Sequence, residues 1–116
     1  MDQYTEQRPW GSFTILEDKD NFKTKRLDVL PEKRLSLQSH QRRSEHWIVV
    51  TGSAKITVGD KIKNYSKGEH VFVPTGCKHR IENIGRTLLT IVEVQLGDYF
   101  GEDDIIRYED DFDRHF

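Results

Sequence analysis

The balance between alanine and β-branched residues constrains the fold of this chain more than any other feature of its sequence. The chain contains a single alanine, Ala54, against eight valines, nine isoleucines and eight threonines. Alanine is the strongest helix former, whereas β-branched side chains fit the pleated surface of a strand. The composition therefore predicts an all-β fold and nearly excludes a helix bundle. Because the chain has 116 residues, we expect one domain over residues 1–116.

Short strand-like segments, separated by turn residues, follow one another along most of the chain. We predict strands at residues 12–16, 22–29, 34–40, 46–50, 54–58, 61–65, 70–73, 79–83 and 87–95. Gly59 and Asp60 form a predicted two-residue hairpin turn. Many short strands at near-regular spacing are typical of a sandwich or a small barrel. Near the C-terminus, Ile105, Tyr108 and Phe112 lie three and four residues apart, which predicts a short helical or coil tail outside the barrel.

The charge and apolar patterns of the chain exclude several classes of partner. The net charge is −2, and the acidic stretch over residues 102–113 would repel the phosphates of a nucleic acid. No apolar run approaches the length of a membrane span, and the N-terminus lacks the pattern of a signal peptide. The single cysteine, Cys77, cannot form an internal disulfide, which fits a reducing compartment. We therefore expect a cytoplasmic protein that binds neither nucleic acid nor membrane.

The predicted strand over residues 34–40 leaves two arrangements open. Leu35 and Leu37 share one face of this strand. Ser36, Gln38 and His40 share the other. Taken alone, the segment favours leucines in the core and polar residues in water. The alternative is a barrel with a polar interior, whose leucines pack against a second sheet or a second subunit.

Four polar residues form a candidate metal site. Gln38 and His40 lie two apart on one strand, so their side chains point the same way and can reach one ion. Glu45 comes from the next strand, and His79 from a later one that follows a turn with proline and glycine. An amide oxygen, a carboxylate and two imidazoles suit a divalent transition metal. A lone strand histidine or glutamate is more often a solvated group, so the combined spacing carries this prediction.

The spacing of these residues forms two motif blocks. The first contains Gln38, His40, Glu45 and Gly52, and the second contains Gly68, Pro74, Gly76, His79 and Asn83. The blocks resemble the paired motifs of the cupin superfamily. The first block departs from the family pattern twice, because Glu32 stands where the leading glycine belongs and Gln38 replaces a histidine. The resemblance implies a double-stranded β-helix, also called a jelly-roll barrel.

Further sequence stretches restrict this resemblance to one group of cupins. They lie at residues 8–11, 25–26, 35–38, 40–47, 79–83, 93–97 and 101–107. They are similar to the cupin domain of type II phosphomannose isomerases, which is usually the C-terminal part of enzymes with a mannose-1-phosphate guanylyltransferase domain. The similarity covers roughly residues 8–114, and Asp113 again replaces a family glycine. It implies interconversion of mannose 6-phosphate and fructose 6-phosphate. Guanylyl transfer is not expected, because the chain has no room for that domain.

The implied reaction assigns roles to several residues. One divalent metal ion, with zinc as first choice and manganese, cobalt, nickel or iron as alternatives, would be bound by Gln38, His40, Glu45 and His79. The catalytic candidates are Arg43, Glu93 and Lys25, and the substrate-binding candidates are Arg43, Lys25, Arg107 and Gln95. Arg43 would bind the phosphate or stabilise the transition state. Glu93 is the candidate base, with an exposed strand carboxylate as its alternative. A solvated lysine is the alternative for Lys25, and a surface salt bridge for Arg107.

Two rival functions stay open at this point. One is a non-catalytic cupin that binds sugar phosphates, and the other is a metal-dependent oxygenase, because many cupins hold iron. Gln38 in place of histidine argues for a site less suited to redox chemistry. We also expect a homodimer, since a polar barrel interior limits the core and Leu35, Leu37 and Trp47 need a dry surface.

Overall fold

A computed structural model describes residues 3–112, and within this range the protein contains strands and no helix. The strands are β1 (Tyr4–Arg8), β2 (Gly11–Asp18), β3 (Phe22–Val29), β4 (Leu37–Ser39), β5 (Arg43–Thr51), β6 (Ser53–Val58), β7 (Lys61–Ser66), β8 (His70–Val73), β9 (His79–Asn83), β10 (Leu89–Gly97) and β11 (Ile106–Glu109). The expected all-β fold is confirmed, as is the hairpin turn between β6 and β7, where Gly59 has a φ of 60°. The described part of the chain has no helix long and apolar enough to cross a membrane.

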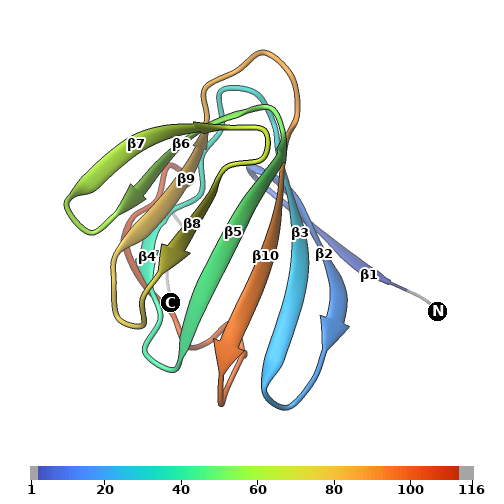
Figure 1. Ribbon diagram of the computed structural model, residues 1–116, viewed down its shortest axis with the longest axis vertical. Coiled ribbons are helices and arrows are strands. Elements are labelled where there is room, and N and C mark those ends of the chain that lie inside the picture. The colour runs from blue at the N-terminus through green and yellow to red at the C-terminus, as the bar shows by residue number, and fades with distance from the viewer. Residues whose placement is uncertain (1–2, 113–116) are drawn as a thin grey trace.

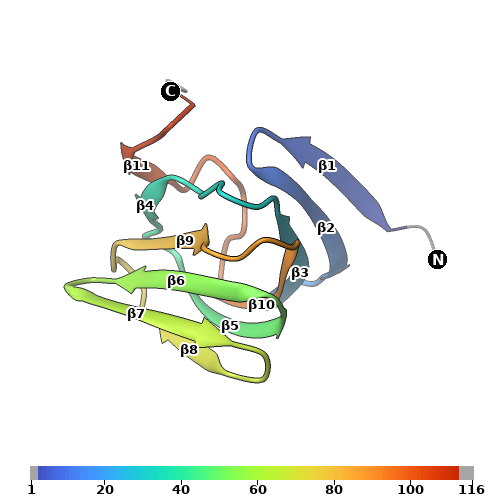
Figure 2. The same ribbon diagram turned by 90° about the horizontal axis from the view of Figure 1, so that it is seen from above.

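The strands form two antiparallel sheets that face each other (Figures 1 and 2). The larger sheet has the order β1-β2-β3-β10-β5-β8, and the smaller one has the order β11-β4-β9-β6-β7. Strands far apart in the sequence are neighbours in both sheets, as in a jelly roll. Figure 2 shows the two sheets facing each other, with β3, β10 and β5 in one and β4, β9 and β6 in the other.

The strand pairing gives the barrel two different ends. At one end, β5 begins where β10 ends, because Arg43 pairs with Gly97. We call this the site end, and it contains Lys25, His40, Arg43, Glu45, His79 and Glu93. At the other end, Val29 of β3 pairs with Leu89 of β10. We call this the apolar end, and it contains the buried residues Val29, Val49, Ala54, Ile81, Leu89 and Ile91.

The inward side chains of three strands change character between these ends. From the site end to the apolar end, they are Lys23, Lys25, Leu27 and Val29 on β3, Arg43, Glu45, Trp47 and Val49 on β5, and Gln95, Glu93, Ile91 and Leu89 on β10. All twelve are buried. Alternation along a strand therefore determines which side chains point inward, and the position along the strand determines whether an inward side chain is polar or apolar. The arrangement with a polar interior, left open by the sequence, holds at the site end.

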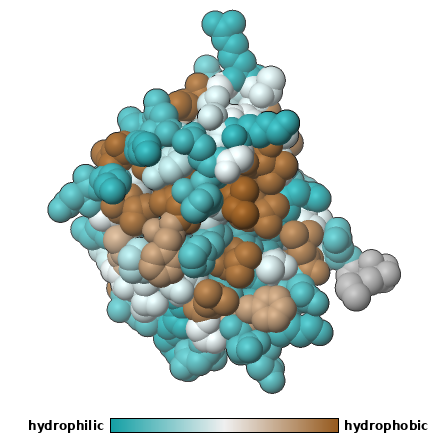
Figure 3. All heavy atoms as spheres, viewed as in Figure 1, coloured by the Kyte–Doolittle hydropathy of each residue, from teal (hydrophilic) through white to brown (hydrophobic). Residues whose placement is uncertain are grey.

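The segment before His40 is irregular, which corrects the continuous strand expected over residues 34–40. Only Leu37–Ser39 forms β4, and Arg34 makes an isolated bridge with Glu82. Strict alternation is lost, since Leu35 packs against the core and also lines the same cavity as Gln38. Three exposed apolar residues, Ile48, Phe72 and Leu96, lie on the outer face of the larger sheet, and Figure 3 shows apolar groups between polar ones on this side of the molecule.

Trp47 corrects one reason for expecting a dimer. Its side chain is 2% exposed and packs inside the barrel, so it does not need a dry outer surface. The homodimer itself stays a prediction.

The C-terminal segment corrects a second expectation. Instead of a helix or coil outside the barrel, Ile106–Glu109 forms β11 and pairs antiparallel with β4. Ile106 lies opposite Ser39, and Arg107 lies opposite Gln38. The edge of a short strand exposes backbone groups that a further strand can pair, and this pairing outweighs the helical spacing of the apolar residues. Asp113 lies outside the described residues.

Glu32 occupies the position at which the cupin motif begins with glycine. Its φ is 66°, and it is the only residue other than glycine within residues 3–112 that has a positive φ. This left-handed conformation costs about 1–2 kcal/mol for a residue with a Cβ atom. Glu32, which stands where the motif has glycine, therefore lies at a strained turn.

Candidate metal centre and cavity

A cavity opens at the site end of the barrel. Its wall includes all four predicted metal ligands. It also includes Lys25, Arg43, Glu93, Glu102 and Arg107. The solvated alternative for Lys25 and the exposed alternative for Glu93 are wrong, since these side chains are 3% and 5% exposed.

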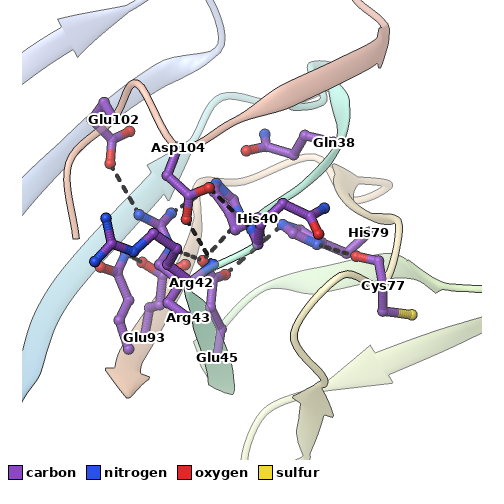
Figure 4. A network of polar contacts seen from close by, with 12 residues as sticks. Gln38, His40, Arg42, Arg43, Glu45, Cys77, His79, Glu93, Glu102 and Asp104 are labelled. Atoms are coloured by element: carbon purple, nitrogen blue, oxygen red, sulfur yellow. Dashed lines mark hydrogen bonds and ion pairs between the residues drawn. The ribbon is translucent and has the colours of Figure 1, made fainter. Parts of the chain in front are cut away.

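Three of the predicted ligands come together in this cavity. His40 follows β4, Glu45 lies on β5, and His79 is the first residue of β9; Figure 4 shows them turned toward one another. One potential ligand atom from each lies within 4.8 Å of the other two. Nδ1 of His40 is 3.6 Å from Oε2 of Glu45, and Nε2 of His79 is 3.9 Å from Oε1. Ligand atoms around one zinc ion lie about 2 Å from the metal, so only small movements would close this set.

The two imidazoles are uncharged, as metal binding requires. Nδ1 of His79 is 3.0 Å from the carbonyl oxygen of Cys77 and donates to it, which leaves the Nε2 lone pair facing Glu45. Nδ1 of His40 is buried and has no hydrogen-bond partner among residues 3–112. Burial lowers the pKa of His40 to about 3, with a further contribution from Arg43. Burial also lowers the pKa of His79 to about 4. Both rings are therefore neutral near pH 7, and the donor set fits a divalent transition metal.

The fourth predicted ligand lies to one side of this set. Gln38 on β4 pairs with His79 on β9 and lines the cavity. Its amide nitrogen is 3.0 Å from Oγ of Ser36 and donates to it. No dashed line in Figure 4 joins Gln38 to the three ligands. Coordination through the Gln38 amide oxygen stays a prediction.

Arg43 connects the ligand set to the mouth of the cavity. Its Nε donates to Oε2 of Glu45 at 2.8 Å, and its Nη2 is 2.9 Å from Nε2 of His40. A guanidinium group only donates, so His40 accepts this second bond. A neutral imidazole that binds a metal through one nitrogen carries its proton on the other. Metal binding by His40 through either nitrogen would therefore change its contact with Arg43.

A second carboxylate lies beside the ligand set. Nε1 of Trp47 is 3.0 Å from Oε1 of Glu45 and 3.0 Å from Oε2 of Glu93, so one indole N–H serves both groups. Nε2 of Gln95 donates to Oε1 of Glu93 at 2.6 Å. Burial and the nearby charge of Glu45 raise the pKa of Glu93 to about 7. Gln95 is fully buried next to Glu93 and is not among the residues that line the cavity.

A cluster of opposite charges lies at the cavity mouth. Nζ of Lys25 is 3.1 Å from Oε2 of Glu102 and 4.4 Å from the centre of the Phe13 ring. The same oxygen of Glu102 is 3.4 Å from Nη1 of Arg43. Burial alone would raise the pKa of Glu102, but Lys25 and Arg43 hold this pKa at about 2. Glu102 is thus an anion at neutral pH.

Comparison with known proteins now identifies the family. A family model described as the C-terminal domain of mannose-6-phosphate isomerase matches residues 2–110. The chain belongs to this family. It is 44% identical over 107 residues to xanthan biosynthesis protein XanB of Xanthomonas campestris, and 46% identical over 103 residues to mannose-1-phosphate guanylyltransferase 2 of Escherichia coli O157:H7. These alignments cover 92% and 89% of this chain but 23% and 21% of the two relatives, so the chain spans less than a quarter of their length.

Solved structures confirm the cupin fold of this family member. Oxalate decarboxylase from Bacillus subtilis superimposes with a TM-score of 0.82 at 18% identity, over 91% of this chain and 30% of that one. A double-stranded β-helix protein from Klebsiella pneumoniae gives a TM-score of 0.73 at 16% identity, over 83% of this chain and 82% of that one. At these identities the likeness shows the double-stranded β-helix alone.

Two residues of the site were not among the site residues predicted from the sequence. Glu102 stands within the family stretch at residues 101–107, but its contact with Lys25 joins positions 77 apart. Trp47 lies two residues after Glu45 and so on the same face of β5. This spacing could have indicated that the indole points inward. Its contact with two carboxylates could not be found in the same way, because the second carboxylate, Glu93, lies on β10.

Proposed function

We propose that this protein is a metal-dependent isomerase that interconverts mannose 6-phosphate and fructose 6-phosphate. The observation that carries the proposal is the joint presence, on one cavity wall, of three metal ligands, a second buried carboxylate and two buried cations. A metal-dependent isomerase that acts on a sugar phosphate would use each of these groups, for oxyanion stabilisation, proton transfer and phosphate binding respectively. The description of the family supports the choice of substrate. Zinc is the first choice of metal, with manganese, cobalt, nickel and iron as alternatives.

The proposed reaction moves a proton between C1 and C2 of the open-chain sugar. A divalent ion at His40, Glu45 and His79 would polarise the carbonyl group and stabilise negative charge on its oxygen. Glu93 removes the proton from C2 of mannose 6-phosphate, the electron pair forms a C1–C2 double bond, and the C1 oxygen gains charge. The proton on Glu93 exchanges with solvent, and Glu93 then delivers a proton to C1 while the hydroxyl proton on O2 moves to O1. The products are fructose 6-phosphate and the regenerated carboxylate.

The position of Glu93 supports its role as the base. It lies on the cavity wall, and Trp47 holds it beside the ligand Glu45. Gln95 donates to its other oxygen, so two donors orient the carboxylate. In this arrangement Gln95 is a positioning residue rather than a substrate contact.

The cations of the cavity would bind the negatively charged phosphate group of the substrate. Lys25 and Arg43 are both buried and both reach the mouth of the cavity, where Glu102 lies. A guanidinium group matches the oxygen geometry of phosphate, and an ammonium group adds a point charge. Arg107 on β11 lies on the same wall as a third cation.

Proton exchange with solvent tests the proposal directly. Mannose 6-phosphate is incubated in deuterated water with protein that has been stripped by a chelator and reloaded with one divalent metal. We expect conversion to fructose 6-phosphate with deuterium at C1, seen by NMR, and loss of both signals on chelation or in Glu93→Gln. Glu17→Gln, which removes an exposed carboxylate at the end of β2, is the matched control. Binding of the sugar phosphate without exchange under every metal would contradict isomerase activity and favour the non-catalytic alternative.

A further inference from the structure

One side chain of the loop between β10 and β11 reaches into the cavity. The carboxylate of Glu102 contacts both Lys25 and Arg43 through a single oxygen, Oε2, and Figure 4 shows Glu102 on the side of the cavity near Arg43. Both distances, 3.1 and 3.4 Å, are those of ion pairs. Glu102 therefore occupies the place at which two cations converge.

The burial of these partners is unequal. Lys25 and Arg43 are 3% and 5% exposed, whereas the side chain of Glu102 is 47% exposed. A buried cation without a partner is strongly unfavourable. Arg43 also pairs with Glu45, but Glu102 is the sole ion-pair partner of Lys25 within residues 3–112. Glu93 lies opposite Lys25 in the pairing of β3 with β10 but forms no ion pair with it, so displacement of Glu102 favours another anion beside Lys25.

The loop is anchored at points other than Glu102. Asp104 accepts hydrogen bonds from the backbone N–H groups of Gln41 and Arg42, at 3.1 and 3.0 Å. Asp98 forms an ion pair with the Arg42 side chain at 3.2 Å. The carboxylate of Glu102 can therefore leave the cations by rotation of its own half-exposed side chain, while the backbone of the loop stays in place.

The space inside the cavity favours such an exchange. The cavity has a volume of about 60 Å³. On this scale a single water needs roughly 10–15 Å³, so the cavity with Glu102 in place holds only a few waters. A phosphate group that reaches Lys25 and Arg43 has to take the place of the Glu102 carboxylate.

We propose that Lys25 and Arg43 form an anion subsite, and that Glu102 is its internal occupant, which the phosphate group of the substrate displaces. The identity of the anion as a sugar phosphate rests on the proposed function. Glu102 is then a specificity-determining residue: a sugar without phosphate cannot replace the lost charge beside Lys25. A phosphate dianion replaces this charge. It can offer a separate oxygen to each of the two cations, whereas Glu102 contacts both with a single oxygen.

Titration with inorganic phosphate tests this exchange without turnover. Calorimetry on chelator-treated protein excludes phosphate binding to a metal. Glu102→Gln keeps the shape of the side chain and removes the competing charge, so we expect phosphate to bind about tenfold more tightly than to the unaltered protein. Asp103→Asn is the matched control, because it removes a charge from the same loop at a residue that contacts Tyr99. We expect the phosphate affinity of Asp103→Asn to change by less than roughly twofold.

A second variant locates the subsite. Lys25→Gln in the Glu102→Gln background should reverse the gain in phosphate affinity. If Glu102→Gln does not fold, as judged by circular dichroism, Glu102→Asp takes its place, since the shorter carboxylate withdraws from the cations and should give a smaller gain. An unchanged or weaker phosphate affinity in the folded variant overturns the proposal, as does a gain that survives Lys25→Gln.

Kinetics separate this inference from the proposed function. If isomerisation occurs and Glu102→Gln leaves phosphate affinity unchanged, the subsite is wrong and the isomerase stands. If Glu102→Gln tightens phosphate binding and no exchange occurs with any metal, the subsite stands and the isomerase is wrong. If both hold, Glu102→Gln lowers KM for the sugar phosphate more than it changes kcat.

Discussion

The site end and the apolar end of this barrel are built from the same three strands, yet their interiors have opposite chemistry. On β3, β5 and β10, the inward positions hold charged or amide groups at one end and aliphatic groups at the other. Each fully buried aliphatic side chain contributes about 1.5–3 kcal/mol to folding, whereas a buried charge is tolerated only with a partner. The comparison teaches that the apolar end stabilises the fold and thereby allows the site end to hold groups selected for chemistry.

The largest expected effect comes from a cavity made at the apolar end. Leu89 is fully buried at the start of β10, so Leu89→Ala should lower the free energy of unfolding by about 4 kcal/mol. Urea unfolding in the presence of a chelator measures this loss. Leu88→Ala, at the exposed neighbouring residue, should change it by less than about 1 kcal/mol. A loss of metal affinity in folded Leu89→Ala would show that the two ends are not separable.

The converse experiment changes a ligand at the site end. Asparagine at position 79 can still donate to the carbonyl of Cys77 but offers no Nε2 to a metal. His79→Asn should weaken metal binding at least a hundredfold, about 2.7 kcal/mol, while the stability of the metal-free protein changes by less than about 1 kcal/mol. Competition with a chromogenic chelator measures the affinity. His46→Asn, on the outer face of β5, should leave metal binding intact; equal weakening in both variants would contradict the assigned site.

A third prediction concerns the pH dependence of the site end without metal. The pKa of Glu93 rises from 4.5 to about 7 on folding, so the folded state favours its protonated form. Its contribution to stability is therefore complete below pH 4.5 and is lost as the pH rises through 7. Glu93→Gln removes this loss and should be more stable than the unaltered protein by about 3 kcal/mol at pH 8, with little difference at pH 4.5.

Urea unfolding at both pH values, with a chelator present, measures this difference. The variant Glu17→Gln removes an exposed carboxylate and should show no such pH-dependent gain. The measured quantity is the stability of Glu93→Gln minus that of the unaltered protein. If this difference is smaller at pH 8 than at pH 4.5, the cost assigned to the buried carboxylate is contradicted.

The smallest effect lies in the turn that leads into β4. Glycine adopts a positive φ without the steric penalty of a Cβ atom, so Glu32→Gly should raise the free energy of unfolding by about 1 kcal/mol. Thermal unfolding followed by circular dichroism checks the gain. Lys33→Gly, at a neighbour with ordinary φ, should instead lower stability. A loss in both variants would mean that the glutamate side chain stabilises the turn more than its backbone strains it.

The sequence predicted much of the fold because local rules decide it. The boundaries of β3, β8 and β9 agree with the predicted strands, since alternation and turn residues mark them. β1 was missed, because Tyr4–Arg8 is a largely polar edge strand without a clear apolar face. β11 was missed as well, since its pairing with β4 joins segments far apart in the chain.

The candidate site divides in the same way. His40, Glu45 and His79 could be predicted, because fixed spacing on paired strands brings them together. The inward position of Lys25 followed from its alternation with Leu27. The contact of Glu102 with Lys25 could not be predicted, because it depends on the path of a loop over the cavity.

The indole of Trp47 has a practical consequence. Its N–H contacts Glu45 and Glu93, its ring meets the edge of His79 with centroids 5.4 Å apart, and Trp10 lines the same cavity. The chain has two tryptophans, so all of its indole fluorescence originates at the cavity wall. The protein thus carries an intrinsic optical reporter, whose emission responds to events in the cavity without any attached label.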